Sequence, residues 1–487
     1  MGDIFTNSIW PIIVVLIYTL TLLVSIAVIF VERQSPGATL AWLLILWMLP
    51  VVGLFLYLIW SQPFVRRNMK DLSSKESLNT DARLTKQIES IREGTFEYVN
   101  TQASDLRQLV KFNQTYAGAV LTQDNNIEIF THGMQNFENM FNDIDAARKY
   151  INIEYFIIKP DEVGLALIKA LTKKAERGVK VRLLMDAMGS SMMKSTDVQA
   201  LIDAGGEVKR FLPGKISKIG LNFNYRNHRK LVVIDGSVAY LGGLNAAKEY
   251  VGISKKFKGW RDTNIRLEGS GVIDVDDRFL MDWNYASGDE LKVDLDEYDN
   301  HFPKGDMAVQ IVSSGPESSE SEIKLAYLKM IDSATRNLFI QTPYFVPDES
   351  IFEAIKTAAL SGVDVRIMIP NRPDHPFVYW VTYSNVGKLL EYGVKVYIYN
   401  KGFLHAKTMT VDSKVSSVGS ANFDIRSFDL NFESNAIVYD REFALNMEQD
   451  FQDDISECTK LTKEIFEGRS IWIKIKESIG RLLTAIL

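Results

Sequence analysis

One pattern of histidine, lysine, aspartate, glycine and asparagine occurs twice in this chain with identical spacing. Both copies obey His-x-Lys-x4-Asp-x6-Gly-[Gly/Ser]-x-Asn. Their polar members are His228, Lys230, Asp235 and Asn245 in the first copy and His405, Lys407, Asp412 and Asn422 in the second. The chain has only five histidines, so chance does not account for two of them at matching positions of a repeat.

Each copy is predicted to form a β-hairpin. In the first copy, an apolar, β-branched run at 230–234 is followed by an Asp-Gly turn and a second apolar run at 238–241. Side chains two positions apart on a strand point the same way, so each histidine lies beside its own lysine. Asp235 and Asp412 fall at the turns, where an aspartate more often stabilises its hairpin than takes part in chemistry. We therefore give these two motif residues a mainly structural role.

A histidine beside a lysine suits chemistry on a phosphodiester, because the lysine neutralises the phosphate charge. With two copies, one histidine attacks phosphorus and forms a phosphohistidine, while the other protonates the leaving alcohol and then acts as base for an acceptor. The lysines, with Asn245 and Asn422 as hydrogen-bond donors, supply charge stabilisation, so we expect neither a metal nor a cofactor. A lone histidine would more often be structural; the fixed spacing favours catalysis. Symmetry does not assign which histidine attacks.

Each histidine also needs a carboxylate that fixes its tautomer. Glu433 follows the second motif and is the candidate there. Asp262, within the Gly-Trp-Arg-Asp-Thr segment at 259–263, is the analogous candidate after the first motif. The alternative for either residue is a surface ion pair. We expect both carboxylates to line the substrate site.

The internal repeat extends beyond the motifs. Arg-Gly-Val-Lys-Val-Arg at 177–182 matches Ser-Gly-Val-Asp-Val-Arg at 361–366. Each half reads as strand, helix, strand, helix and strand before the hairpin, with helices expected at 162–176 and 349–361. This alternation predicts an α/β fold of two homologous α/β sandwich halves. A pseudo-two-fold axis between the halves would bring both histidines into one cleft.

Composition limits the class of substrate. The net charge is −6 and the pI is about 5.6, which counts against a nucleic-acid partner because such enzymes carry a basic face. The single cysteine, Cys458, excludes an intrachain disulfide and fits a reducing compartment.

Two uncharged stretches near the start indicate a membrane protein. The stretches at about 9–31 and 39–60 each exceed the ~20 residues that a bilayer span requires, so we expect a two-helix transmembrane hairpin. Arg66, Arg67 and Lys70 follow the second stretch, against Arg33 alone in the loop. The positive-inside rule then places the catalytic region in the cytoplasm of a multi-pass protein of the cell membrane.

The carboxyl end carries a basic amphipathic helix. Its apolar positions include Ile471, Trp472, Ile475 and Ile479, and such a helix either lies in the lipid interface or packs on the domain. We expect the division of the chain to be a membrane hairpin at 1–65, a polar linker at 66–110, a first half at 111–290, an inter-half linker at 291–305, a second half at 306–465 and the terminal helix at 466–487.

The doubled motif resembles that of the phospholipase D superfamily, and the surrounding segments are similar to bacterial cardiolipin synthases. The segments that resemble cardiolipin synthases lie in the membrane hairpin (Glu-Arg-Gln-Ser-Pro-Gly-Ala at 32–38) and in the second half (Gln-Thr-Pro-Tyr-Phe at 341–345 and Gly-Phe-Leu-His-Ala-Lys-Thr at 402–408). The resemblance implies two phospholipase D-like halves. It also implies joining of two phosphatidylglycerol molecules into cardiolipin with release of glycerol, His228 as nucleophile and His405 as acid. Position 243 is glycine where the family commonly has serine.

Other functions remain open from the residues alone. A membrane phospholipase D would pass the phosphohistidine to water and yield phosphatidic acid. Phosphatidylserine synthesis uses the same chemistry with another alcohol. The intact motifs disfavour an inactive lipid-binding scaffold, and the charge and membrane segments disfavour a nuclease. The oligomeric state and acyl-chain preference leave no trace in the sequence.

Overall fold

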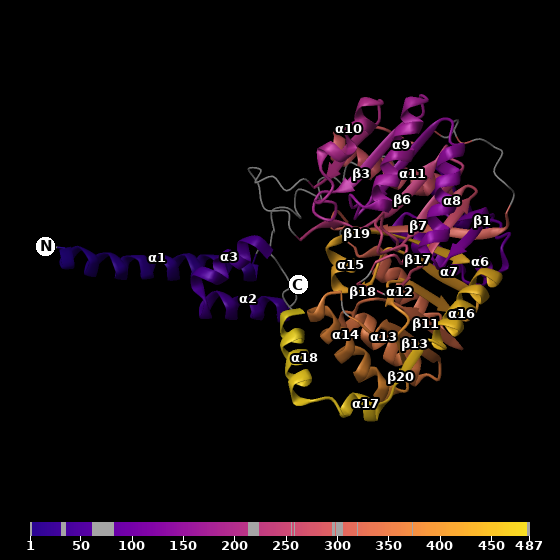
Figure 1. Cartoon of the computed structure of the whole chain (residues 1–487). Helices are drawn as coiled ribbons and strands as arrows, with labels where there is room; N and C mark the ends of the chain where they lie inside the picture. The colour runs from indigo at the N-terminus through magenta and orange to yellow at the C-terminus, as the bar shows by residue number, and fades with distance from the viewer. Residues whose placement is uncertain are drawn as a thin grey trace.

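The computed structural model describes residues 2–30, 36–60, 82–212, 224–254, 256–257, 259–294, 298, 305–318, 320–372 and 374–484. An elongated group of N-terminal helices stands beside a large α/β body that carries both motifs (Figure 1). Most of the predicted inter-half linker at 291–305 lies outside the described residues, as does the first part of the polar linker at 66–110.

The predicted α/β fold of two similar halves is confirmed. Strands of both halves join in one mixed sheet of 16 described strands, because β1 (Thr122–Phe130) pairs antiparallel with β10 (Met307–Ser314) across the boundary. The remaining strands of this sheet are β2 (Tyr150–Tyr155), β3 (Lys180–Asp186), β4 (Glu207–Phe211), β5 (Arg226–Asn227), β6 (Lys230–Ile234), β7 (Val238–Gly242) and β9 (Asn264–Glu268) in the first half, and β11 (Asn337–Gln341), β13 (Asp364–Pro370), β14 (Lys395–Tyr399), β16 (Thr408–Val411), β17 (Val415–Gly419), β19 (Asn431–Tyr439) and β20 (Cys458–Leu461) in the second.

The two halves repeat one strand arrangement. In the first half β2, β3 and β4 are parallel, and β6 runs antiparallel to β2. In the second half β11, β13 and β14 are parallel, and β16 runs antiparallel to β11. The hairpins predicted from the motifs are β6–β7 and β16–β17. Each motif therefore enters its half-sheet at the same place.

Helices cover both faces of the sheet, so its central strands are buried on both sides. In the first half, α8 (Gly133–Ala146), α9 (Glu162–Glu176) and α10 (Ser195–Asp203) pack on one face and α11 (Gly271–Ser287) on the other. In the second half, α12 (Glu322–Asp332), α13 (Glu349–Leu360) and α14 (Pro376–Leu389) face α16 (Arg441–Ile455) across the sheet.

Local signals explain the two helices predicted from the repeat. Asp161 begins α9 by accepting hydrogen bonds from the amides of Val163 and Gly164, and Asp348 begins α13 in the same way. Gly178 and Gly362 follow the two helix ends with positive φ, which glycine adopts without steric cost. The first helix has the predicted bounds, and the second ends one residue earlier.

The predicted membrane hairpin is only partly confirmed. The helix α1 (Gly2–Phe30) contains a candidate span, Trp10–Phe30, of 21 residues with mean hydropathy 2.9. The second stretch forms two shorter helices, α2 (Pro36–Met48) and α3 (Pro50–Trp60). A Cβ atom at Gly53 would lie 2.7 Å from the carbonyl oxygen of Ile45, so α3 folds back on α2. Pro50 has no N–H and cannot continue α2, and the sequence reading of one continuous second span was wrong on this point.

The terminal helix α18 (Ile471–Thr484) combines both expected properties. It packs against α14, where a Cβ atom at Gly480 would lie 2.8 Å from Val381. Its predicted apolar side remains uncovered, and Ile471 and Trp472 are 65% and 71% exposed. The helix therefore docks on the domain while presenting an apolar surface. The side chains at 482–487 lie outside the described residues.

Candidate active site

The structure brings the two motifs together at one cavity. His228 and His405, one from each half, line a cavity of about 360 Å³ together with Asn245 and Asn422. Aromatic rings hold both imidazoles, since Phe156 lies 5.1 Å from His228 between ring centroids and Trp260 lies 5.1 Å from His405. The cavity is thus a single site built from both halves.

His228 is oriented by the second half. The strand just before it, β5, pairs parallel with β19, and the His228 amide donates to the Phe432 carbonyl at 2.9 Å. This pairing sets the Nδ1 atom of His228 2.9 Å from Oε2 and 3.0 Å from Oε1 of Glu433. Because the carboxylate engages Nδ1, Nε2 is the nitrogen left for phosphorus or a proton.

His405 is oriented by the first half in the same manner. Its segment, β15 (Phe403–Leu404), pairs parallel with β8 (Trp260–Arg261), and the His405 amide donates to the Arg261 carbonyl at 2.7 Å. The Nδ1 atom of His405 lies 2.7 Å from Oδ2 of Asp262. The sequence reading set Asp262 with the first motif and Glu433 with the second; the structure crosses these partners, so each half supplies the carboxylate for the other half's histidine.

Two buried lysines surround the imidazoles with positive charge. Lys230 donates to the His228 carbonyl oxygen, and Lys407 donates to that of His405 at 2.5 Å. Burial lowers the pKa of Lys230 to about 7 and that of Lys407 to about 8. Burial also lowers the pKa of His405 to about 4, with Lys407 adding repulsion. An anion entering the cavity would relieve this crowding of cations, so the site favours a phosphate.

The carboxylates remain ionised despite their burial. Burial alone raises the pKa of Glu433, but attraction to His228 and Lys230 outweighs it and leaves the pKa below its ordinary value. The pKa of Asp262 is lowered in the same balance, by His405 and Lys407. Each histidine therefore has a fixed negative partner that can stabilise an imidazolium or a phosphohistidine.

The two motif asparagines line the cavity, and the glycine at 243 packs behind it against the carboxylate of Asp262. Asn245 Oδ1 accepts from the Ile157 amide at 3.0 Å. Among the described residues no atom hydrogen-bonds to the buried Oδ1 of Asn422, which leaves a hydrogen-bond acceptor in the cavity wall for a hydroxyl group of a ligand. A Cβ atom at Gly243 would lie 2.1 Å from Oδ1 of Asp262, so a serine at this position would displace the carboxylate that orients His405.

The motif aspartates lie outside the cavity wall. Asp235 accepts from the backbone amides of Arg148, Lys149 and Tyr150 at 2.7–2.9 Å, which fixes the start of β2. Asp412 accepts from the corresponding amides at 335–337 at 2.7–2.9 Å, which fixes the start of β11. Both aspartates therefore hold backbone segments in place, which is the structural role inferred from their position at the turns.

Arg229, inside the first motif, positions His228. Its guanidinium is buried and binds both carboxylate oxygens of Asp282 at 2.6 and 2.8 Å. It also donates to the Glu433 and Ser314 carbonyls, each at 3.0 Å. The second motif has Ala406 at this place. Arg229 therefore ties the strand segment of the first histidine to the second half through these two carbonyls.

Sequence reasoning missed several residues of the cavity wall. Arg226, Tyr250, Tyr344, Asp374 and Arg426 all line it. Tyr344 falls in the Thr-Pro-Tyr-Phe segment and Arg426 follows the second motif, so proximity to these segments was a usable signal. Arg226 lies in the short strand β5, and Tyr250 and Asp374 lie in loops, none of them within a recognisable pattern.

The cavity also includes His375. The residue lines the cavity, yet its side chain is 71% exposed, which places it at the mouth.

Two like halves, a shared cavity and two carboxylate-bound histidines define the phospholipase D class of phosphatidyl-transferring enzymes. Residues 140–255 and 327–455 match the family described as cardiolipin synthase, PLD-like domain, and residues 19–62 match the phospholipase D-nuclease N-terminal family. The chain belongs to the cardiolipin synthase family.

Known proteins agree with this assignment. The chain is 44% identical to the major cardiolipin synthase of Bacillus subtilis over 99% of this chain and 100% of that protein. It is 44% identical to a cardiolipin synthase of Listeria welshimeri over 94% of this chain and 95% of that protein. Among solved structures, phosphatidylserine synthase of Haemophilus influenzae aligns with a TM-score of 0.61 at 15% identity, covering 78% of this chain and all of that one, which shows a shared fold.

The lysine environment predicts that kcat/KM falls at alkaline pH. A lysine loses its charge as the pH rises through its pKa, here about 7 for Lys230 and about 8 for Lys407, so the attraction for a phosphodiester is present below these values and lost above them. We expect the decline in profiles from about pH 6 to about pH 10, since kcat/KM reports the free enzyme. Lys230→Arg keeps the charge that is lost first and should extend the active range. A profile flat to about pH 10 in the wild type would contradict this expectation.

Proposed function

We propose that this protein is a cardiolipin synthase that transfers a phosphatidyl group from one phosphatidylglycerol to another. The observation that carries the proposal is the pair of crossed histidine–carboxylate contacts at a single cavity. The relatives that match the whole chain carry the name of this activity. An enzyme with one nucleophile and one acid–base group at the same phosphorus needs no further catalytic group.

The reaction proceeds in two displacements. His228 Nε2 attacks the phosphorus of the donor lipid, the bond from phosphorus to glycerol oxygen breaks, and His405 gives its proton to the departing glycerol. The phosphatidyl group is then held on His228. A glycerol hydroxyl of the second lipid passes its proton to His405 and attacks phosphorus, and the nitrogen–phosphorus bond breaks to release cardiolipin. Lys230, Lys407 and the two motif asparagines stabilise the phosphate oxygens in both steps.

The product of a single substrate tests this proposal. Full-length protein reconstituted in vesicles of phosphatidylglycerol alone should form cardiolipin and glycerol in equal amounts, followed by mass spectrometry of the lipids and an assay for free glycerol. Phosphatidic acid with glycerol would instead make the protein a hydrolase that uses water. Absence of turnover in vesicles that also contain other phospholipids would contradict both reactions.

The protein is associated with the membrane, and we propose that its catalytic region faces the cytoplasm. The apolar part of α1 is long enough to cross a bilayer, and the uncovered apolar side of α18 suits the lipid interface. The basic residues Arg66, Arg67 and Lys70 follow the second apolar stretch, on the side that leads to the catalytic region. The positive-inside rule places them in the cytoplasm whether the segment at 39–60 crosses the bilayer, as in a multi-pass protein, or turns back within it.

Tag accessibility tests the orientation. A protease site added after Leu487 should resist protease in intact protoplasts and be cleaved after lysis. A site added before Met1 serves as the comparison, since it is cleaved in intact cells only if the segment at 39–60 turns back. Cleavage of the carboxyl-terminal site in intact cells would overturn the cytoplasmic placement.

A further inference from the structure

Two arginines from different halves meet in the wall of the cavity. Arg226 belongs to β5, and Arg426 belongs to α15 (Ile425–Asp429), which follows the second motif. Arg226 is 7% exposed. Apart from the histidines, these guanidiniums are the cationic groups among the described residues that line the cavity. Arg426 is partly buried, and two like charges largely withdrawn from water at one wall favour an anionic ligand beside them.

The carboxylates near these arginines are already bound to backbone amides. Asp186 lies 3.8 Å from Arg226, but it accepts from the Asn227, Met188 and Gly189 amides at 2.8–3.0 Å. Asp424, also in the cavity wall, accepts from the amide of Ser427 at 2.7 Å and so begins α15. Backbone amides therefore stabilise part of the negative charge of each carboxylate, so that the carboxylates neutralise the arginines only in part. Burial lowers the pKa of both arginines, and repulsion from Arg426 contributes at Arg226.

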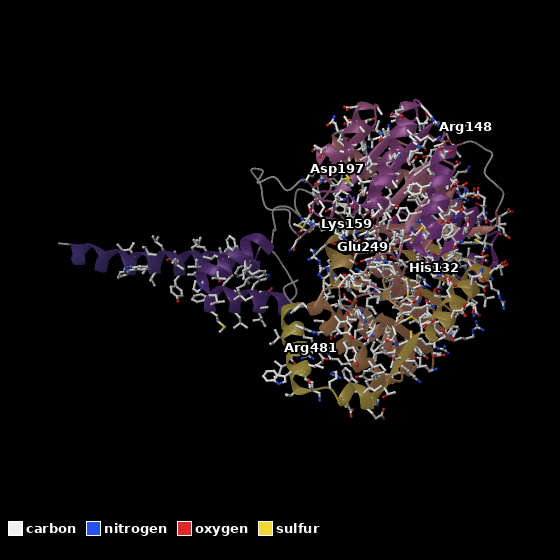
Figure 2. The ribbon with its side chains drawn as sticks, in the orientation of Figure 1. His132, Arg148, Lys159, Asp197, Glu249 and Arg481 are labelled. Atoms are coloured by element: carbon white, nitrogen blue, oxygen red, sulfur yellow. The ribbon has the colours of Figure 1, made fainter. Side chains whose placement is uncertain are left out.

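Arg426 has no counterpart in the first half. Arg426 stands four residues after Asn422, and the matching place after Asn245 is Glu249. Glu249 forms an ion pair with Lys159, and both residues are labelled in Figure 2. Both halves therefore supply a histidine, a lysine and an asparagine. The positive charge of Arg426 is added on the side of the second half only. An enzyme with two lipid substrates needs such asymmetry, because donor and acceptor play different parts.

The chemistry of the product requires a second phosphate site. Donor and acceptor phosphatidylglycerol are both anions, and cardiolipin carries two phosphodiesters joined by one glycerol. The histidines and lysines of the motifs neutralise the phosphate that reacts. The phosphate of the acceptor lies one glycerol away from it, and like charges at that separation repel strongly in a buried cavity unless a cation intervenes. A guanidinium can bind a phosphate through two parallel hydrogen bonds.

Building on the proposed function, we infer that Arg226 and Arg426 bind the phosphate of the acceptor phosphatidylglycerol. The pair thereby selects an anionic phospholipid over water or a free alcohol as acceptor. Arg426 also donates to the Asn224 carbonyl at 2.9 Å, a contact that holds its guanidinium toward the cavity wall. These two arginines act on the second displacement and leave the first to the motif residues.

An assay with two acceptors and one donor distinguishes a role in binding the acceptor from a general loss of activity. Wild type, Arg426→Gln, Arg426→Lys and Arg226→Gln are compared in phosphatidylglycerol vesicles with isotope-labelled glycerol present. Cardiolipin formation reports the anionic acceptor, and entry of label into phosphatidylglycerol reports glycerol, a neutral acceptor that shares the same phosphohistidine. Arg441→Gln is the matched control, because Arg441 lies exposed on α16.

We expect each glutamine variant to lower cardiolipin formation at least about tenfold and glycerol exchange by less than about threefold, from the loss of a charged hydrogen bond. The lysine variant should fall between glutamine and wild type. Persistent glycerol exchange also shows that a variant is folded. An equal decline of both reactions, or none in either, would overturn the inference.

The lipid products of the wild-type protein show whether a failure concerns this inference or the proposed function. Cardiolipin formed by the wild type together with equal declines in the variants would leave the function intact and remove the acceptor role of the arginines. Phosphatidic acid as the sole wild-type product would remove the function, and with it any site for a second lipid.

Discussion

Replacing either His228 or His405 with alanine should lower cardiolipin formation by at least about four orders of magnitude, because removal of one member of a coupled catalytic set disables the whole set. Both imidazoles line one cavity, and each is held by a buried carboxylate. The measurement is the initial rate of cardiolipin formation in phosphatidylglycerol vesicles. His132→Ala is the matched control, since His132 is exposed at the start of α8 and does not line the cavity (Figure 2 labels it).

A donor with an acidic leaving group then separates the roles of the two histidines. Phosphatidyl-nitrophenol needs no general acid, so His405→Ala should release one equivalent of nitrophenol per active site and stop with the lipid bound to His228. His228→Ala should give no such burst. The covalent adduct is checked by mass spectrometry of the intact protein. A burst in His228→Ala and none in His405→Ala would reverse the assigned roles, and slow steady turnover in both would contradict a phosphohistidine mechanism.

Local features of the fold could be predicted from the sequence because they depend on neighbouring residues. The hairpin β6–β7 follows from β-branched residues around the Asp-Gly turn. The limits of α9 follow from Asp161 at its start and Gly178 beyond its end. The repeated motif likewise predicted the two-half fold.

Features set by distant contacts could not be predicted in the same way. The break at Pro50 was missed because hydropathy measures the length of an apolar stretch and says nothing of the fold-back of α3 on α2. Arg226 entered the cavity wall without any motif, through the pairing of β5 with β19. From the sequence, each carboxylate was also assigned to the wrong histidine, because contacts between distant segments decide these pairs. A carboxylate that follows a motif along the chain need not reach its histidine, and two short parallel pairings, β5 with β19 and β8 with β15, decide the contacts.

The crossed partners predict which histidine each carboxylate variant impairs. Glu433→Gln should impair His228, and Asp262→Asn should impair His405, although each carboxylate belongs to the half of the other histidine. We expect overall cardiolipin formation to fall by about two to four orders of magnitude in either variant, as when an orienting carboxylate is made neutral in other histidine-dependent enzymes. Glu457→Gln, at a surface ion pair with Lys401, is the control.

The nitrophenyl donor distinguishes crossed from same-half partners. Glu433→Gln should slow the nitrophenol burst, because the nucleophile His228 loses the carboxylate that holds its tautomer. Asp262→Asn should keep the burst and slow the second displacement, because His405 is then a poorly oriented base for the acceptor. If each carboxylate served the histidine of its own half, Asp262→Asn would slow the burst and Glu433→Gln would spare it. The burst rate therefore reports directly which half orients which histidine, and with it whether either half could act without the other.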